Sequence, residues 1–583
     1  MTSRQPPRPE PTASPGIRPV RLEGIRKVAL ETGRHRLLVT GALFALVFML
    51  VGGRLIHLAV LERGDEPQLA RSAVVQPTVA GRADIIDRNG VILATSLPTA
   101  SLFSNPREVL DRHAAADKLA SVLPGLDRAE VVAKLGSPSG FVWLRRNLTP
   151  TQQYAVNRLG IPGLRFHRAE RRVYPHGRQA AHVLGFTDVD GRGIAGAERY
   201  FNTLLRSGSG HLQLSIDIRV QTILREELSV TVAEFDAIAG AAIVLDANTG
   251  EVVALTSLPD FDPNNPAAFS GQTRFNQVTK GVYELGSIFK VFTAAMALDS
   301  RTVTLEDGYD TSKPIRIARF TINDYHGKKR WLSVPEILVY SSNIGAAKMA
   351  LDVGTQTQRA YLGRLGLLDA SAIELPEVGA PLVPAPWRDI NTMTISYGHG
   401  IAVSPLQLAE SVAAVVNGGV RHAATLLKHH AAAPPAGRRV LSAKTSRQMR
   451  SLMRLVVRHG TGRKADAVGY RVGGKTGTAE KLRAGRYDSR PLISSFVGAF
   501  PMDAPRYVVL CLLDEPKGQE STRGYATGGW VAAPVVRRLV RRIAPLAGIA
   551  PAQSEEPPAP GPPLFVPASG KPAKVRGRRV VAN

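Results

Sequence analysis

Three short strings in this chain carry residue types that together could perform acyl transfer with a serine nucleophile. They are S-I-F-K at residues 287–290, S-S-N at 341–343 and K-T-G-T at 475–478. A serine hydroxyl is a poor nucleophile at neutral pH and needs a nearby base. Each string alone is common in a chain of 583 residues. Their order, wide separation and local context favour one catalytic site over chance.

Ser287 and Lys290 are expected to share a face at the start of a helix. A spacing of three residues is nearly one helical turn, so the two side chains can meet. Residues 281–286 are typical of a loop, whereas 291–298 are apolar and typical of a buried helix. We therefore predict that Ser287 lies at a helix N-terminus, where backbone N–H groups favour developing negative charge. An ordinary serine N-cap is the alternative.

Lys290 can act as the base only when it is neutral, which requires a pKa well below the ordinary lysine value. Burial and a neighbouring cation both lower the pKa of a lysine, and Lys475 could be that cation. Ser341 could pass the proton onward, and Asn343 could hold Lys290 or a substrate amide by hydrogen bonds. Alone, the S-S-N string would indicate only a helix cap or a turn.

Residues 473–479 (G-G-K-T-G-T-A) are predicted to form a strand without bulky side chains. Glycine inside a strand marks the close approach of a ligand or another backbone. The residues of this strand predicted to bind a substrate carboxylate beside Lys475 are Thr476, Gly477 and Thr478. The backbone N–H groups of Ser287 and Thr478 are predicted to form an oxyanion hole, worth about 3–4 kcal/mol per donor in comparable enzymes. A glycine-rich turn without a catalytic role is the alternative.

With these residues in place, the chain resembles a class B penicillin-binding protein, a peptidoglycan D,D-transpeptidase, between about residues 37 and 545. The similarity includes residues 81–90 and the stretch 172–198, which in this family tie two extracytoplasmic domains together. Residues 403–409 and 514–516 are also similar to the family. The basic N-terminal tail, the moderate size of the N-terminal domain and the residues around Gly286 are most similar to the division-specific (FtsI) type.

Three positions depart from the usual family pattern. Leu285 stands where many members have Pro, Ile288 where many have Thr, and Ala83 where many have Gly. Neither residue beside Ser287 replaces an acid, a base or an oxyanion donor, so catalytic activity is still expected. The two changes could tune the affinity for β-lactams.

The resemblance implies an α+β protein, in which a transpeptidase domain with a five-stranded antiparallel sheet flanked by helices stands on an elongated N-terminal pedestal domain. The residues themselves predict a hairpin of strands 241–245 and 251–255 around an Asn- and Gly-containing turn. Residues 493–500 and 506–513 predict a second antiparallel pair. The strand carrying Lys475 makes five strands, whose order comes from the resemblance.

Five segments are predicted along the chain. They are a basic cytoplasmic tail (1–36), a transmembrane anchor (37–61), a pedestal domain of the penicillin-binding protein dimerisation type (62–215), the transpeptidase domain (216–545) and a disordered Pro/Lys/Arg-rich tail (546–583). The composition of the first segment also predicts disorder. Residues 211–216 are predicted to be a strand that leads into a helix from Asp217.

The apolar run 37–53 contains no charged side chain. A cleaved signal peptide is the alternative to an anchor, but its basic region would be unusually long and no small-x-small cleavage site directly follows the run. Residues 1–36 hold eight Lys and Arg against three Glu. The positive-inside rule therefore predicts a cytoplasmic tail, with the catalytic site on the opposite side of the membrane.

The chain has a net charge of +26 and a single cysteine, Cys511. Outside the membrane a nucleic acid is not an available target, so anionic headgroups and wall polymers are the expected partners of this charge; the alternative is arginine-rich codon usage without function. A disulfide within the chain is impossible, and the apolar run 507–513 predicts a buried thiol.

No metal and no cofactor are expected. The histidines lack zinc-binding spacing. The G-x-G-x-x-G string at residues 191–196 does not follow an apolar strand, so it does not predict a dinucleotide site. Asp188 and Asp190 lack the twelve-residue calcium pattern.

The resemblance then implies a single-pass protein of the bacterial inner membrane that cross-links peptidoglycan through an acyl-enzyme on Ser287, with its catalytic domain in the periplasm and at the division septum. The implied partners are peptidoglycan stem peptides, β-lactam antibiotics, a separate FtsW-like glycosyltransferase and divisome proteins, without nucleic acid. The alternatives are an elongation-specific transpeptidase, a D,D-carboxypeptidase, β-lactamase or sensor of the same fold, and a non-catalytic divisome scaffold.

Overall fold

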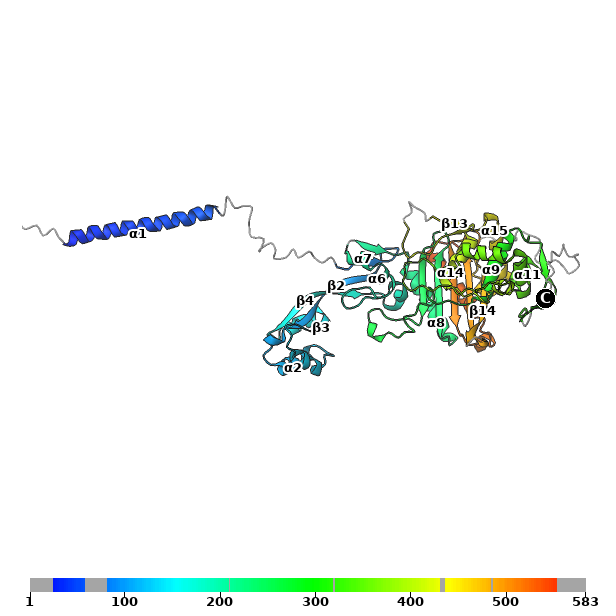
Figure 1. The fold of residues 1–583 in the computed structure, drawn as a ribbon, viewed down its shortest axis with the longest axis horizontal. Helices are drawn as coiled ribbons and strands as arrows, with labels where there is room; N and C mark the ends of the chain where they lie inside the picture. Colours follow the sequence, from blue (N-terminus) through cyan, green and yellow to red (C-terminus); the bar gives the residue numbers. More distant parts are fainter. Residues whose placement is uncertain are drawn as a thin grey trace, which may run out of the picture. The chain divides into compact units, whose positions relative to one another are not determined.

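The computed structural model describes residues 25–57, 81–208, 210–317, 320–429, 436–483 and 486–552. These residues belong to two compact units, with the division after Val79. The first unit contains α1 (Ile25–Ile56), shown in Figure 1. Its segment Leu38–Leu55 has a mean hydropathy of 2.0 and is long and apolar enough to cross a membrane.

The helix α1 begins earlier than the apolar run. The expectation of disorder is therefore wrong for residues 25–36, which are helical. The physical reason is that the prolines of the tail all precede this stretch, the last being Pro19. The rest of the predicted tail and residues 58–80 lie outside the described residues.

The second unit begins with a domain that we call the pedestal (residues 81–216), which is built on a mixed sheet. Strands β1 and β5 are parallel, and the other pairs are antiparallel in the order β3-β2-β1-β5, with β4 also paired to β2. The strands are β1 (Asp84–Ile86), β2 (Ile92–Ser104), β3 (Val142–Leu148), β4 (Leu164–Val173) and β5 (His211–Gln213). The helices are α2 (Arg112–Val122), α3 (Arg128–Leu135), α4 (Pro150–Asn157), α5 (Ala181–Leu184), α6 (Gly196–Tyr200) and α7 (Asn202–Arg206).

A buried ion cluster holds the pedestal together. Glu198 is fully buried and accepts hydrogen bonds from Arg82 at 2.6 Å and from Arg172 at 2.7 Å. A buried carboxylate needs such partners, because breaking the set would leave an uncompensated charge. These residues lie in the two stretches that resemble the family pattern.

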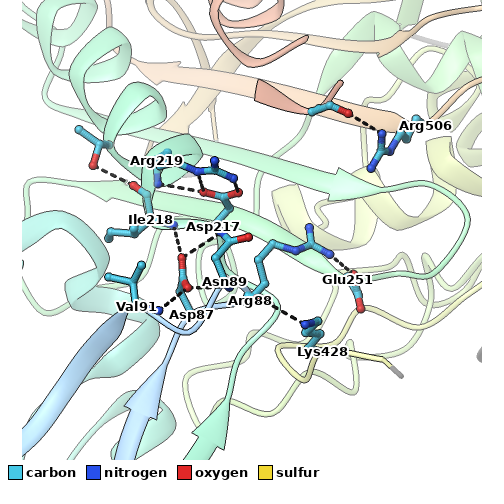
Figure 2. A network of polar contacts seen from close by, with 12 residues as sticks. Asp87, Arg88, Asn89, Val91, Asp217, Ile218, Arg219, Glu251, Lys428 and Arg506 are labelled. Atoms are coloured by element: carbon cyan, nitrogen blue, oxygen red, sulfur yellow. Dashed lines mark hydrogen bonds and ion pairs between the residues drawn. The ribbon is translucent and has the colours of Figure 1, made fainter. Parts of the chain in front are cut away.

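The loop after β1 joins the pedestal to the C-terminal domain (residues 217–552), as Figure 2 shows. The Asp87 carboxylate accepts two backbone N–H groups of its own loop and, at 3.2 Å, that of Ile218, the first residue of α8 (Ile218–Glu234). Arg88 forms an ion pair with Glu251 at 2.6 Å, and its carbonyl accepts a hydrogen bond from Lys428 at 3.0 Å. One loop of the pedestal thus contacts three segments of the C-terminal domain.

The C-terminal domain is built on one antiparallel sheet in the order β14-β15-β16-β6-β7. Its strands are β6 (Ala239–Asp246), β7 (Val252–Leu258), β14 (Gly473–Arg483), β15 (Arg486–Phe500) and β16 (Tyr507–Asp514). Both predicted antiparallel pairs and the α+β fold class are confirmed.

Successive side chains of this sheet enter different cores, as expected for strands buried on both faces. In β16, Leu510 and Leu512 belong to one buried cluster, and Cys511 and Leu513 to the other. The first cluster includes α9 (Phe289–Asp299) and α14 (Pro405–Val416), and the second includes α8 and α16 (Ala532–Leu546). Cys511 is fully buried, as predicted.

Smaller elements complete the C-terminal domain (Figure 1). Its other helices are α10 (Val334–Val339), α11 (Asn343–Val353), α12 (Thr355–Leu365), α13 (Asp389–Ile395) and α15 (Ala443–His459). Its short strands are β8 (Gly308–Asp310), β9 (Ile315–Ile317), β10 (Phe320–Ile322), β11 (Trp331–Ser333), β12 (Val420–Arg421) and β13 (Arg438–Arg439).

Two expected boundaries differ in the structure. The strand predicted over 211–216 ends at Gln213, because Leu214 and Ser215 pair with residues 426–427 of the C-terminal domain. Residues 546–552 were expected to be disordered, but Ile549 packs on the core and Ala552 donates its N–H to Gly469 at 2.7 Å. Residues 553–583 lie outside the described residues.

Candidate active site

Ser287 lies in a short 3-10 turn, Gly286–Ile288, that leads directly into α9. Gly286 has φ +55°, and a side chain there would place its Cβ 2.5 Å from the carbonyl oxygen of Thr478. Glycine is therefore required for the turn to pack against β14. The Ser287 side chain is half-buried, and Lys290 follows in the first turn of α9 with 1% of its surface exposed.

The predicted meeting of Ser287 and Lys290 occurs: Lys290 Nζ lies 2.7 Å from Ser287 Oγ. In the described part of the chain, the hydrogen bonds of Nζ reach only uncharged oxygen atoms, including Asn343 Oδ1 at 2.6 Å and the carbonyl oxygen of Ser341 at 3.0 Å. Burial and the nearby Lys475 hold the pKa of Lys290 well below its ordinary value. A neutral amine can donate to the two amide oxygens and accept the hydroxyl proton of Ser287.

Ser341 connects the two lysines. Its Oγ lies 3.2 Å from Lys290 Nζ and 3.0 Å from Lys475 Nζ. Its backbone has φ +59°, a left-handed conformation that is uncommon for a non-glycine residue and occurs at functional sites. Ser341 lies between α10 and α11. In this conformation, both its hydroxyl and its carbonyl oxygen contact Lys290 Nζ.

Lys475 lies on β14 and is fully buried. Burial lowers its pKa to about 7. Besides Ser341, its Nζ contacts the carbonyl oxygen of Thr476 at 3.1 Å and Thr476 Oγ1 at 3.3 Å. Thr476 Oγ1 lies 2.7 Å from Oγ1 of Thr461, which follows α15. The lysine is therefore held on one side by the S-S-N string and on the other by its own strand.

The glycines of β14 allow three backbones to approach closely. A Cβ on Gly474 would lie 2.4 Å from the carbonyl oxygen of Val497, and a Cβ on Gly477 would lie 2.4 Å from that of Leu285. The Ser287 turn consequently packs on the strand at Gly477 and Thr478. The proposed oxyanion donors, the N–H groups of Ser287 and Thr478, thus belong to segments in direct contact.

Asn323 and Asp324 hold the S-S-N string in place and were not found from the sequence. The carbonyl oxygen of Asn323 accepts the amide of Asn343 at 2.9 Å, which turns Asn343 Oδ1 toward Lys290. The Asp324 carboxylate accepts Ser342 Oγ at 2.7 Å and the N–H of Ile344 at 3.0 Å, at the start of α11. Both residues lie in the loop between β10 and β11. Their sequence forms no recognisable motif, and their contacts with residues 342–344 depend on the path of that loop.

Tyr397 and His399 also border the site. Lys290 Nζ lies 6.0 Å from the centre of the Tyr397 ring, and the centre of that ring is 5.4 Å from the centre of the His399 ring. Burial, together with the charge of Lys290, lowers the pKa of His399 to about 4. Between them, Gly398 packs against the carbonyl oxygen of Gly286, where a Cβ would approach to 2.1 Å. The Ser287 turn therefore packs against this segment as well as against β14.

The family departures beside the nucleophile are core residues. Leu285 and Ile288 are both fully buried and belong to the first of the two core clusters. The string at residues 191–196 forms a turn in which Thr187 pairs with Gly193, without a preceding apolar strand. Within the described ranges, no three His, Cys, Asp or Glu side chains are grouped as metal ligands.

Comparison with known proteins agrees with this architecture. The family described as the penicillin binding protein transpeptidase domain matches residues 240–541, and the penicillin-binding protein dimerisation domain matches residues 77–231. A probable peptidoglycan D,D-transpeptidase FtsI of Caulobacter vibrioides is 41% identical over 488 residues, which cover 81% of this chain and 82% of that protein.

Two solved structures are also similar. The transpeptidase domain of penicillin-binding protein 3 from Burkholderia pseudomallei is 36% identical, with a TM-score of 0.53, and covers 58% of this chain and 98% of that one. A peptidoglycan synthetase from Bifidobacterium adolescentis has the same fold, with a TM-score of 0.64 at 24% identity over 82% of this chain and 97% of that one. The chain thus belongs to the class B penicillin-binding proteins and is a peptidoglycan D,D-transpeptidase.

Proposed function

We propose that the enzyme works by two acyl transfers through Ser287. Ser287 Oγ attacks the carbonyl carbon of the penultimate D-Ala of a stem peptide while Lys290 Nζ takes the hydroxyl proton. The N–H groups of Ser287 and Thr478 stabilise the tetrahedral oxyanion. When the intermediate collapses, the peptide C–N bond breaks, the proton returns to the leaving amine through Ser341, and terminal D-Ala departs.

In the second transfer, an amine of a neighbouring stem peptide attacks the Ser287 ester. Its proton passes to Lys290, the ester C–O bond breaks, and the serine hydroxyl is restored as the new peptide bond forms. During the first transfer, the terminal D-Ala carboxylate is bound by Lys475, Thr476, Gly477 and Thr478. Asn343 orients Lys290 in both transfers. A water molecule in place of the amine would give a D,D-carboxypeptidase, and the acceptor decides between these outcomes.

β-Lactams would acylate the same serine as mimics of the D-Ala-D-Ala terminus. The observation that supports this proposal is the 2.7 Å contact between Ser287 Oγ and the buried Lys290 Nζ, whose hydrogen bonds within the described ranges reach only uncharged oxygen atoms. The test is to label the full chain with a fluorescent penicillin and to map the modified peptide by mass spectrometry. We expect the label on Ser287 and none in Ser287→Ala; a label that persists in that variant would contradict the assignment, and a folded wild type without label would favour a scaffold.

We further propose that α1 anchors the enzyme in the bacterial inner membrane and that the catalytic domain is periplasmic and acts at the division septum. The apolar span Leu38–Leu55, the basic residues before it and the similarity to FtsI-type proteins support this placement. A transpeptidase of this type needs glycan strands, so an FtsW-like glycosyltransferase and divisome proteins are the proposed partners. Depletion should produce filaments, whereas rounded cells would indicate the elongation-specific alternative.

A further inference from the structure

The pedestal contacts the C-terminal domain at a second place besides the loop of Asp87. There the aromatic ring of Phe186 packs on Phe261 and Phe269, with ring centres 5.9 and 4.9 Å apart. His182 donates from Nε2 to the carbonyl oxygen of Thr273 at 2.9 Å. Residues 261–273 lead directly into the segment that ends at Ser287. The pedestal therefore packs at the base of the nucleophile-bearing segment.

One polar contact at this second place is made by Glu377. Its half-buried carboxylate accepts the backbone N–H of Gly196 in the pedestal, at 3.2 and 3.4 Å. Gly196 is closely packed: it has φ +60°, and a Cβ there would lie 2.4 Å from the backbone nitrogen of Gly185. The carboxylate is thus fixed to a tightly packed part of the pedestal.

The backbone of Glu377 is in turn bonded to the segment that carries the nucleophile. Its carbonyl oxygen accepts the hydroxyl of Thr279 at 2.5 Å, and the carbonyl oxygen of Thr279 accepts the N–H of Gly379 at 2.9 Å. Thr279 is fully buried. The N–H groups of Val278 and Thr279 both bond to Asn276 Oδ1, at 3.0 and 3.2 Å, which fixes the turn at the start of the segment.

From this turn the chain runs to Ser287 under close restraint. Tyr283 exchanges two backbone hydrogen bonds with Val403, at 2.9 and 3.0 Å. Glu284 accepts the N–H of Gly400 at 3.0 Å, and Gly286 packs on Gly398. A displacement at Thr279 therefore has few ways to be absorbed before it reaches the nucleophile. Misplacement of a reacting group by about 1 Å can cost about 10²-fold in rate.

A small cavity shows that these groups converge. It is lined by Gly196 of the pedestal, by Asn276 and by Glu377, and its volume is about 20 Å³. The amide nitrogen of Asn276 is buried and has no hydrogen-bond partner among the described residues. Because Gln has the same shape as Glu, we expect it to fit at position 377 with its Oε1 still accepting the N–H of Gly196.

We propose that Glu377 is a positioning residue through which the pedestal holds the segment 276–286, and with it Ser287, in the reactive position. The inference rests on the proposed acyl transfer at Ser287. It assigns to the pedestal a direct effect on acylation, beyond a role as a spacer between the membrane and the active site.

The test compares variants of the full chain by the dissociation constant K for a fluorescent penicillin, the acylation rate constant k2 and the melting temperature. Removal of the carboxylate in Glu377→Ala should lower k2 about tenfold, as expected for a small misplacement, with K changed less than about twofold. Glu377→Gln should restore k2, because its amide oxygen still accepts the N–H of Gly196.

Glu374→Ala is the matched control. Glu374 is also half-buried and accepts two hydrogen bonds, from Thr425 and Leu426, at 2.7 Å each; among the described residues its carboxylate makes no hydrogen bond to segment 276–286. This variant should lower the melting temperature by a similar amount and leave k2 unchanged. An equal loss of k2 in Glu374→Ala would show that general damage explains the effect and would overturn the proposal.

Thr279→Val keeps the side-chain volume and removes the hydroxyl bonded to Glu377, so it serves where Glu377→Ala does not fold. It should lower k2 as well. In the double variant with Glu377→Ala, the fold-loss of k2 should be smaller than the product of the two single fold-losses, because both residues hold the same segment. Wild-type k2 in Thr279→Val and Glu377→Ala would contradict the proposal.

Hydrogen exchange separates this inference from the proposed function. The amides of segment 276–286 should exchange faster in Glu377→Ala or Thr279→Val than in the wild type and in Glu374→Ala. These exchange rates can be compared even if the wild type is not acylated at Ser287. A wild type without acylation would refute the proposed chemistry and not the positioning of segment 276–286. Unchanged exchange in segment 276–286 would overturn the positioning role of Glu377.

Discussion

Lys290 and Lys475 are joined through one hydroxyl: Ser341 Oγ lies 3.2 Å from Lys290 Nζ and 3.0 Å from Lys475 Nζ. Two buried cations this close disfavour each other, so the pair loses a proton more easily than either lysine alone. Lys290 is the one placed against Ser287 Oγ. In the proposed mechanism, this arrangement supplies Lys290 as a neutral base beside the nucleophile and leaves Lys475 as the charge for a substrate carboxylate.

The first prediction concerns Ser341. The change Ser341→Ala removes the hydroxyl between the two lysines, and we expect the second-order acylation constant k2/K for a fluorescent penicillin to fall about 10²–10³-fold, within the range of proton-transfer catalysis. Ser342→Ala is the neighbouring control. It removes the N-cap of α11, at a cost of about 1 kcal/mol of stability, but Ser342 Oγ bonds Gly345 and Asp324 and neither lysine. Normal acylation by Ser341→Ala would exclude a role in proton transfer.

The second prediction concerns pH. In the proposed mechanism, acylation needs a neutral Lys290 and a charged Lys475. Because burial lowers the pKa of Lys475 to about 7, the lysine loses its proton as pH rises through that value, and K for a penicillin should weaken about tenfold per pH unit above it. A penicillin methyl ester, which has no carboxylate, should show no such weakening. An ester whose K weakens equally would show that the titrating group is not the carboxylate partner.

The spacing of Ser287 and Lys290 was sufficient to predict their contact, because a helical turn fixes it locally. The strands of the main sheet were predictable for the same reason, since alternate or continuous apolar runs and a turn signal define them. Asp324 and Glu377 were not predictable, because each contacts its partner through a loop whose path depends on the whole fold. The end of β5 was misjudged because Leu214 and Ser215 pair with a segment about two hundred residues later.

The third prediction concerns Cys511. The thiol is fully buried in β16, and burial raises its pKa to about 12. Since the thiolate is the reactive form, native protein should not react with iodoacetamide or a thiol-exchange dye at pH 8, whereas protein unfolded in guanidinium chloride should react at one thiol per chain. Modification of the folded protein would mean that β16 opens in the native state.

The fourth prediction concerns Asp87, which joins the pedestal to α8 (Figure 2). The carboxylate is fully buried and accepts three backbone N–H groups. Asp87→Ala leaves these donors without a partner, so we expect the free energy of unfolding to fall by about 3 kcal/mol or more. Chemical denaturation of the full chain measures this loss.

Asp87→Asn separates the two roles of this carboxylate. The amide keeps one oxygen, which can accept the N–H groups of Asn89 and Val91, but its NH₂ then faces the N–H of Ile218, at the position of the 3.2 Å contact. This variant should lose less stability than Asp87→Ala and should chiefly weaken the contact between the pedestal and α8. Faster hydrogen exchange at the start of α8, with the loop of residues 87–91 unchanged, is the expected signature. Equal losses in both variants would place the whole effect at the contact with Ile218, whereas no loss in Asp87→Asn would place it within the loop and contradict this prediction.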